Sequence, residues 1–301
     1  MKIVNIIGGL GNQMFQYAFA VTLQEKWKDE VKIDTHHYHY IFSKTFHGNN
    51  FYHNGFEINK IFPNAKLEVA SPWDILKVSY YMPNFKISRV VRKLMPVRKS
   101  EYIQPAKQAY SFAPEALQSE AGYFEGYWMA YKYFESYREK IQEIYSFPLF
   151  TTEENKSYTN IMSNGNSVTI HVRRGDYVKL GAFANICTLD YYRKAIAIAR
   201  QHIDQPEFFV FSNDQEWCVE NLKDAFGDAT VHFVNNNRGS ESYRDMQLMS
   251  MARCNIMANS SFSWWGAFLN AREDQIVIAP HKWMNDRDCS NIYSDDWIKI
   301  E

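Results

Sequence analysis

The chain has few cysteines, no long apolar run and almost no net charge, and each absence excludes a class of protein. Four cysteines are spread over 301 residues, and no two have C-x-x-C spacing. We therefore expect free thiols in a reducing compartment rather than a zinc site or a redox dithiol. Apolar runs stay below the roughly 20 residues that a membrane-spanning helix needs. A net charge of −1 excludes a general basic field for nucleic acid.

The amino terminus also lacks the apolar core of a secretory signal. Its short apolar run over residues 2–7 turns directly into Gly8 and Gly9, which is too short for such a segment. We expect a cytoplasmic protein, with peripheral attachment to the inner face of the membrane as its one form of membrane contact.

Apolar residues are plentiful, at 46% of the chain, and aromatic residues reach 16%. This composition is enough for one large or two medium packed domains. Aromatic side chains serve as core in most proteins and as platforms for sugars or bases in others, and both interpretations stay open here.

The first 150 residues begin regularly and then become irregular. Residues 2–7 predict a strand, apolar positions at helical spacing predict a helix to about Trp27, and residues 31–34 predict a second strand. This is a β-α-β opening. Between 35 and 150 only short helices are predicted, over 73–81 and 131–145. The polar stretch 151–166 is the expected linker.

The second half alternates strands and helices regularly. Such alternation predicts an α/β domain with a parallel, doubly wound sheet. We expect domains at 1–155 and 156–301, with the last residues packing back on the first domain. Strands are predicted over 167–173, 207–211, 230–234, 255–258 and 275–279, and helices over 189–203, 215–226, 241–253 and 262–272.

Polar clusters follow three of these strands. They lie at residues 173–174, 212–214 and 259–261. Ligands of parallel α/β sheets bind beyond the carboxyl ends of the strands, so we expect these clusters to converge on one ligand.

Residues 171–177 (HVRRGDY) are the most informative cluster. Arg173 and Arg174 suit a phosphate, because a guanidinium matches phosphate oxygens bidentately. His171 and Asp176 add an imidazole and a carboxylate nearby. The alternatives are a surface arginine pair and an Arg-Gly-Asp adhesion motif, which a buried strand in a cytosolic protein disfavours.

The other two clusters each allow a structural and a functional interpretation. Ser212 or Asn213 is expected to cap the helix 215–226, while Asp214 can cap it too or hold ribose hydroxyls or a base edge. Ser260 and Ser261 open a helix, whose amino end binds phosphate through free amides and the helix dipole. An ordinary serine cap followed by core tryptophans is the alternative there.

Three further patterns allow an interpretation as ligand sites. The glycines at 8, 9 and 11, with Asp34 downstream, partly match a dinucleotide loop, but Met14 stands where the third glycine belongs. His36, His37 and His39 lack a completing metal ligand, which favours an ordinary loop. The D-x-D at 286–288 lies far from the strand ends in the sequence, so we expect no metal site.

Four segments together resemble the α-1,2-fucosyltransferases, the family of bacterial O-antigen and blood-group H-type enzymes (glycosyltransferase family 11). They are residues 8–18 (GGLGNQMFQYA), 171–177, 211–214 (FSND) and 259–267 (NSSFSWWGA). The similarity extends from the first strand to about residue 280 and leaves 35–150 without a usable motif.

The resemblance implies a GT-B fold of two facing Rossmann-like domains, with GDP-L-fucose in the C-terminal domain and a galactose-terminated glycan on the N-terminal side. It implies inverting, metal-independent transfer of fucose to the galactose 2-hydroxyl, without any cofactor besides the donor substrate. The residues it assigns to the donor are His171, Arg173, Arg174, Ser212, Asp214, Asn259, Ser260, Ser261 and Phe262.

The catalytic residues that the resemblance implies are Arg174, Asp176 and Asn12. Arg174 would stabilise charge on the leaving diphosphate, Asp176 is the leading candidate for the base, and Asn12 with Gln13 would orient a substrate. Two alternatives stay open: a nucleotide-sugar- or glycan-binding protein without turnover, and an NAD-dependent enzyme that uses the glycine loop.

Overall fold

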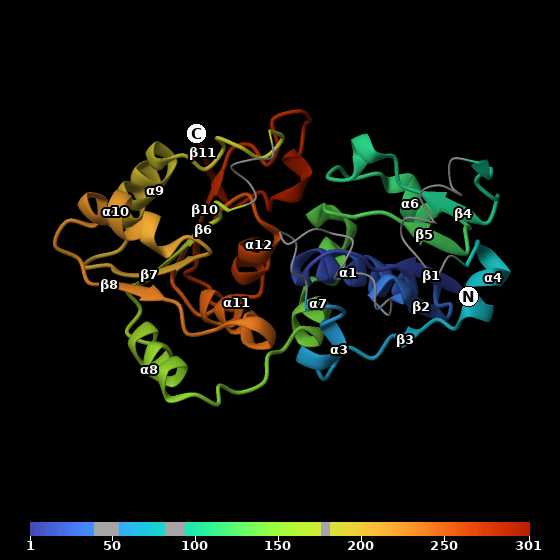
Figure 1. Cartoon of the computed structure of the whole chain (residues 1–301), viewed down its shortest axis with the longest axis horizontal. Helices are drawn as coiled ribbons and strands as arrows, with labels where there is room; N and C mark the ends of the chain where they lie inside the picture. The colour runs from blue at the N-terminus through green and yellow to red at the C-terminus, as the bar shows by residue number, and fades with distance from the viewer. Residues whose placement is uncertain (39–53, 82–93, 176–180) are drawn as a thin grey trace. The chain divides into compact units, whose positions relative to one another are not determined.

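The computed structural model describes residues 1–38, 54–81, 94–175 and 181–301, and the chain divides into two compact units (Figure 1). The first unit comprises Met1–Ser146 with Asn291–Tyr293, and the second Phe147–Ser290 with Ser294–Glu301. Each unit contains one parallel sheet, which confirms the α/β class.

The first unit is built on a five-stranded sheet in the order β3-β2-β1-β5-β4. The predicted β-α-β opening is confirmed, because β1 pairs in parallel with β2 and α1 connects them. A stacked pair of Phe19 of α1 and Trp128, 4.1 Å between ring centroids, lies in the aromatic core. The elements are β1 Lys2–Asn5, α1 Leu10–Trp27, β2 Val31–Asp34, η1 His36–Tyr38, α3 Ile58–Ile61, β3 Glu68–Val69, α4 Pro72–Val78, β4 Glu101–Ile103, η2 Ala106–Gln108, α6 Pro114–Gln118, β5 Tyr123–Glu125, η3 Tyr131–Tyr133, η4 Glu135–Tyr137 and α7 Arg138–Ile144.

The second unit contains a six-stranded parallel sheet in the order β11-β10-β9-β6-β7-β8, and this confirms the predicted doubly wound architecture. Successive side chains of each strand point to opposite faces of the sheet. Val168, Ile170 and Val172 pack with α9 and α10, whereas Phe209 and Phe211 pack with α8 and α11. The elements are α8 Glu153–Met162, β6 Ser167–Val172, α9 Leu189–His202, β7 Glu207–Ser212, α10 Gln215–Phe226, β8 Val231–Val234, η6 Gly239–Glu241, α11 Tyr243–Met249, β9 Cys254–Ile256, α12 Ser261–Phe268, β10 Ile276–Pro280, η7 Ser290–Ile292 and β11 Ile298–Ile300.

The expected linker over 151–166 is wrong, because most of it forms α8 within the second unit. Thr152 caps this helix by accepting a hydrogen bond from the Asn155 amide. Although α8 is mostly polar, Met162, Ile161 and Tyr158 form one apolar edge that packs against the sheet.

Other predicted helices are shorter or divided. The helix expected over 131–145 is two 3-10 turns followed by α7, and the one over 241–253 ends at Met249. The helix expected to reach 272 ends at Phe268. Asn270 lies just beyond it, and its side chain donates to the Ala252 carbonyl, 2.6 Å away.

Candidate functional site

The sheet of the second unit changes winding direction between β6 and β9. The chain proceeds from β6 to β7 and β8 on one side, and then β9 pairs on the other side of β6. The crevice beyond the carboxyl ends of two such strands is where open α/β sheets bind ligands. The loops after β9, β6 and β7 carry the three predicted polar clusters, so the fold places the clusters on neighbouring strands.

Arg174 is held at the end of β6 by three contacts. Its Nε donates to Asp214 Oδ2 at 3.2 Å, its guanidinium lies 4.1 Å from the ring centroid of Trp217, and its backbone amide donates to Asn213 Oδ1 at 3.0 Å. Gly175 makes this approach possible, because a Cβ there would lie 2.4 Å from Asn213 Nδ2. These side-chain contacts engage Nε and the flat face of the guanidinium.

His171 is buried at the end of β6, beside the Phe262 ring at 5.8 Å between centroids. Burial, together with the charge of Arg173, lowers the pKa of His171 to about 3, so the ring is neutral at pH 7. Its Nδ1 is buried and has no hydrogen-bond partner in the described part of the chain. It can offer a ligand a hydrogen bond without adding positive charge.

The residues after β7 hold one another and the next helix. Asp214 caps α10 through Oδ1, which accepts from the Trp217 amide, and pairs with Arg174 through Oδ2. Ser212 Oγ accepts from the Asp214 amide at 2.9 Å. The cap expected from Ser212 or Asn213 is therefore supplied by Asp214, because its carboxylate reaches the first turn.

The segment after β9 combines a buried anchor with a helix start. The Asn259 side chain donates to the carbonyl of Trp283 at 3.1 Å and to that of Phe183 at 3.4 Å, so it fixes two loops. Ser260 caps α12 by accepting from the Phe262 amide. Ser261 and Phe262 form the first turn and are half-buried.

Two predicted catalytic residues lie apart from this cluster. Asp176 lies outside the described residues. Asn12 is half-buried in the first turn of α1, in the first unit. Its neighbour Gln13 is fully buried and bonds to the backbone of Gly8, Gly55 and Glu57, which gives Gln13 a structural role.

The dinucleotide interpretation of the glycine loop loses its one acidic support. Asp34 is buried, and its carboxylate accepts hydrogen bonds from Tyr123 at 2.7 Å and from the ring of His36. In addition, Gln16 bridges the ends of β1 and β5 by accepting from the Ile7 amide and donating to the Gly126 carbonyl. A ribose bound by Asp34 would have to displace Tyr123 or His36 from its carboxylate.

A polar cluster at the carboxyl ends of β1 and β2 went unpredicted. Asn5 and Asp34 pair in register, and His36 contacts the Asp34 carboxylate. Two buried atoms there, Asn5 Nδ2 and His36 Nε2, have no hydrogen-bond partner within the described ranges. Unpaired buried polar atoms are costly. Asp34 and His36 are close in the sequence, but only the pairing of β1 with β2 brings Asn5 beside them, so no local motif could have revealed the whole cluster.

A second unpredicted group surrounds Asp245 of α11. Asn237 donates to Asp245 at 2.8 Å and bonds to Asn155 of α8. Burial raises the pKa of Asp245 to about 7. Asn155 lies 82 positions before Asn237, so no local pattern in the sequence indicates a shared network.

Residues of the two candidate metal patterns contact other side chains. In the D-x-D, Asp286 pairs with Arg287, and Asp288 accepts from Ser290. Over the described residues no three His, Cys, Asp or Glu side chains gather as metal ligands; His39 lies outside that range. All four cysteines are free, as expected.

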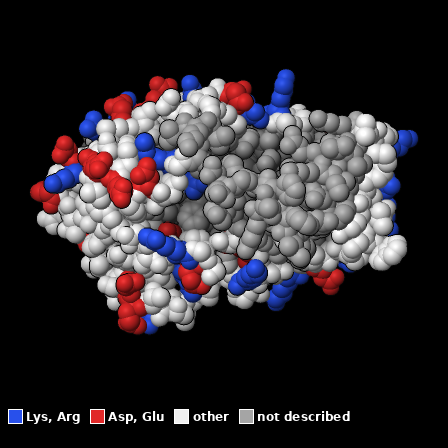
Figure 2. Space-filling model, viewed as in Figure 1, with Lys and Arg blue, Asp and Glu red and all other residues white. Residues whose placement is uncertain are grey.

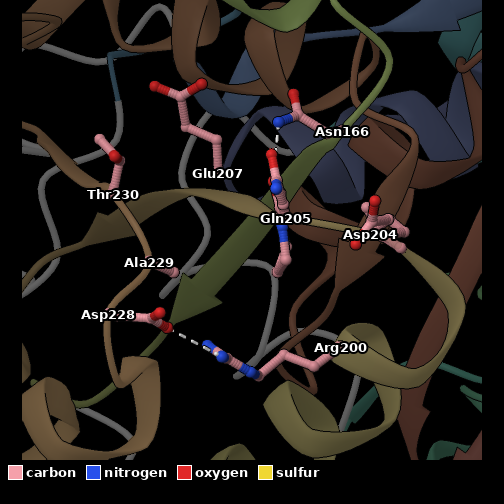
Figure 3. A pocket seen from close by; sticks show the side chains of 10 residues that line it. Asn166, Arg200, Asp204, Gln205, Glu207, Asp228, Ala229 and Thr230 are labelled. Carbon is pink, nitrogen blue, oxygen red and sulfur yellow. Dashed lines mark hydrogen bonds and ion pairs between the residues drawn. The ribbon is translucent and has the colours of Figure 1, made fainter.

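A cavity of about 560 Å³ lies at the opposite, amino end of the second sheet (Figure 3). Asn166, Glu207 and Thr230 line it just before or at the start of β6, β7 and β8. Arg200 and Asp228 also line it, and Figure 3 shows them paired. Because the predicted clusters lie at the carboxyl ends, this cavity is separate from the candidate site.

The second unit is an α/β domain whose parallel sheet has a fixed arginine and a capped helix start at its switch point, the place where open α/β sheets bind ligands. The chain belongs to glycosyl transferase family 11, whose family model matches residues 1–301. It is therefore a glycosyltransferase by family.

The sequence similarity to other proteins extends over nearly the whole chain or over about half of it. An alpha-1,2-colitosyltransferase of Escherichia coli is 31% identical over 99% of this chain and 98% of its own length. The O-antigen biosynthesis glycosyltransferase WbnK of Escherichia coli is 33% identical over 97% and 98%. A galactoside alpha-(1,2)-fucosyltransferase 1 of Saimiri boliviensis boliviensis is 30% identical over 51% of this chain and 44% of that protein.

Among solved structures, the fucosyltransferase NodZ from Bradyrhizobium aligns over 89% of this chain and 91% of that chain, with a TM-score of 0.49 at 15% identity. Across the described ranges, no helix is both long enough and apolar enough to cross a bilayer.

Proposed function

We propose that the protein transfers L-fucose from GDP-L-fucose to the 2-hydroxyl of a terminal galactose on a glycan, with inversion and without a metal ion or other cofactor. The observation that carries this proposal is the fixed guanidinium of Arg174 at the switch point of the second sheet. Membership of family 11 and the names of relatives that act in O-antigen synthesis or on galactosides support the reaction class.

In this proposal the second unit binds the donor. As the bond between fucose C1 and the diphosphate oxygen breaks, negative charge grows on the diphosphate. Arg174 and Arg173, with the amides and hydroxyls of Ser260 and Ser261, stabilise that charge in a preorganised site. Asp214 acts here mainly by orienting Arg174, because both of its oxygens already have partners.

The acceptor is assigned to the first unit. Sugar hydroxyls need both donors and acceptors, and the unpaired Asn5 Nδ2 and His36 Nε2 supply such groups at the carboxyl ends of β1 and β2. Asn12 contributes from the first turn of α1. Asp176 remains the proposed base that takes the proton of the acceptor hydroxyl.

The test measures GDP release from GDP-fucose with a β-galactoside, followed by linkage analysis of the product. Wild type is expected to turn over equally with and without EDTA, and Arg174→Ala is expected to lose roughly 100- to 1,000-fold in rate. Lys194→Ala, an exposed cation of α9, is the matched control. No product with any galactoside, or strict dependence on a metal, would contradict the proposal.

Calorimetric titration with GDP separates the remaining alternatives. GDP binding without turnover would identify a binding protein of the same fold. Binding of NADH instead of GDP would favour the dinucleotide interpretation.

A second candidate donor is GDP-colitose, favoured by the similarity to the colitosyltransferase. Colitose lacks the 3-hydroxyl of fucose. A site built to bond a hydroxyl rejects the analogue without it far more strongly than the reverse. Competition between GDP-fucose and GDP-colitose at equal concentration therefore identifies the donor.

A further inference from the structure

One edge of the first unit exposes large apolar side chains together. Six of the eight large hydrophobic residues that are exposed among the described residues fall between positions 69 and 97. Trp73 of α4 is 75% exposed and Leu94 is 79% exposed. We call Trp73, Leu76, Leu94, Met95 and Val97 the Trp73 surface. Single exposed apolar residues need no explanation, but a contiguous group marks an interaction site.

Hydrogen bonds join the two segments that carry this surface. Arg98 Nη1 donates to the Leu76 carbonyl at 3.3 Å and to the Ser79 carbonyl at 2.9 Å. Ser100 Oγ donates to the Val78 carbonyl at 2.7 Å. The segment that carries Leu94, Met95 and Val97 is thus tied through Arg98 and Ser100 to the carboxyl end of α4, the helix that carries Trp73 and Leu76.

Folding of α4 does not require these side chains. The helix is fixed by a capping box between Ser71 and Asp74, and Ile75 is its one buried residue. Trp73 and Leu76 are three residues apart and therefore lie on one helix face. Both are exposed, so the face is available to a partner.

The charge around this surface indicates which partner it fits. Arg98 and Lys99 directly follow Val97, in a chain of net charge −1, and Lys99 is exposed. Lys77 of α4 is also exposed, and Asp74 is paired with Lys32 and Lys77. Figure 2 shows Lys and Arg without Asp or Glu along the right-hand edge, where Figure 1 places α4.

We propose that the Trp73 surface docks the protein on an anionic lipid bilayer. Tryptophan and aliphatic side chains enter the interfacial layer of a bilayer, and clustered basic residues are attracted to anionic headgroups. A protein partner would also cover apolar side chains, but the described cations beside this surface, Lys77, Arg98 and Lys99, match a uniformly negative surface. The inference uses first-unit residues alone and holds whichever sugar is transferred.

The test is sedimentation of the full chain with vesicles, in the absence of donor. One vesicle contains equal parts of phosphatidylglycerol and phosphatidylcholine, and the other contains phosphatidylcholine alone. Wild type is expected to bind the anionic vesicles and to release them as salt rises. The double variant Trp73→Ser with Leu94→Ser is expected to bind at least about tenfold more weakly, and Leu76→Ser with Val97→Ser serves as a second, independent pair.

Leu149→Ser is the matched control, because Leu149 is 89% exposed in the second unit. Lys99→Glu should weaken binding at low salt, whereas Lys156→Glu on α8 should not. All variants should keep the turnover of wild type on a soluble acceptor. Vesicle binding therefore tests the docking surface, and turnover tests the transferase assignment separately. Absence of vesicle binding by wild type would overturn the proposal, as would binding by both double variants that equals binding by wild type, or a wild-type dimer that these variants dissociate.

Discussion

Arg174 is positioned by side chains as much as by its backbone. Asp214 holds Nε and Trp217 lies against the guanidinium face. From the sequence, both Arg174 and Asp214 are predicted to bind the sugar-nucleotide donor. The structure places their side chains in contact. The carboxylate can therefore act on the ligand indirectly, through the arginine.

The first prediction separates these two roles of Asp214. Asparagine is a good helix cap, so Asp214→Asn should leave the free energy of unfolding nearly unchanged while Arg174 loses its charged partner. Transfer should fall by roughly tenfold, and much less in an Arg174→Ala background. A double-mutant cycle on turnover measures the coupling. Independent, additive losses would assign Asp214 to the nucleotide itself.

The second prediction concerns the buried carboxyl of Asp245. Its pKa is raised to about 7 by burial, against about 4 in an unfolded chain. Between these values the folded state holds a proton that the unfolded state has lost. The free energy of unfolding therefore decreases as pH rises through this window, by on the order of 2 to 4 kcal/mol, and levels off above pH 7.

Asp245→Asn should remove this dependence while keeping an oxygen that accepts from Asn237. Urea unfolding of both proteins at pH 5 and pH 8 measures the difference. An unchanged slope with pH in the variant would show that other groups carry it.

At the scale of elements, α11 and α12 pack closely. A Cβ added at Gly266 of α12 would lie 2.7 Å from Met249 Cβ. Gly266→Ala should therefore destabilise the second unit by about 1 to 3 kcal/mol. Gly181→Ala is the control, because a Cβ there meets nothing within 4 Å. Thermal unfolding compares the two, and equal midpoints would mean that Met249 moves aside at no cost.

Elements with a strong period were predicted well, and those that depend on distant contacts were not. Strands β6 and β7 and helices α9 and α10 lie within a residue or so of their expected bounds, because their apolar period is clear. Strands β3, β4 and β11 have two or three residues each. Such short strands form because they pair with a neighbouring strand. Two or three residues are too few to show the alternation of apolar and polar residues that predicts a strand.

The same distinction applies to the candidate site. Polar residues that directly follow a strand could be predicted, because a parallel sheet aligns strand ends. The contact between Arg174 and Trp217 and the pairing of Asp34 with Tyr123 join segments far apart in the sequence. No local pattern encodes them.

At the scale of the whole molecule, the two units are expected to serve different substrates. GDP should slow amide hydrogen exchange over 171–175, 212–217 and 259–263, and a β-galactoside should slow it near residues 5 and 34–36. Mass spectrometry of exchange with each ligand measures both effects. Protection of residues 8–13 by GDP would instead place the nucleotide at the glycine loop.

The insertion of β9 beside β6 has a consequence for how the protein is made. Thr169 and Cys254 are 85 positions apart but belong to adjacent strands. Contacts between such distant positions slow folding, because a long loop must close first. A growing polypeptide on the ribosome will therefore have emerged almost completely before this crevice can form, and a chain stopped short of β9 will lack it.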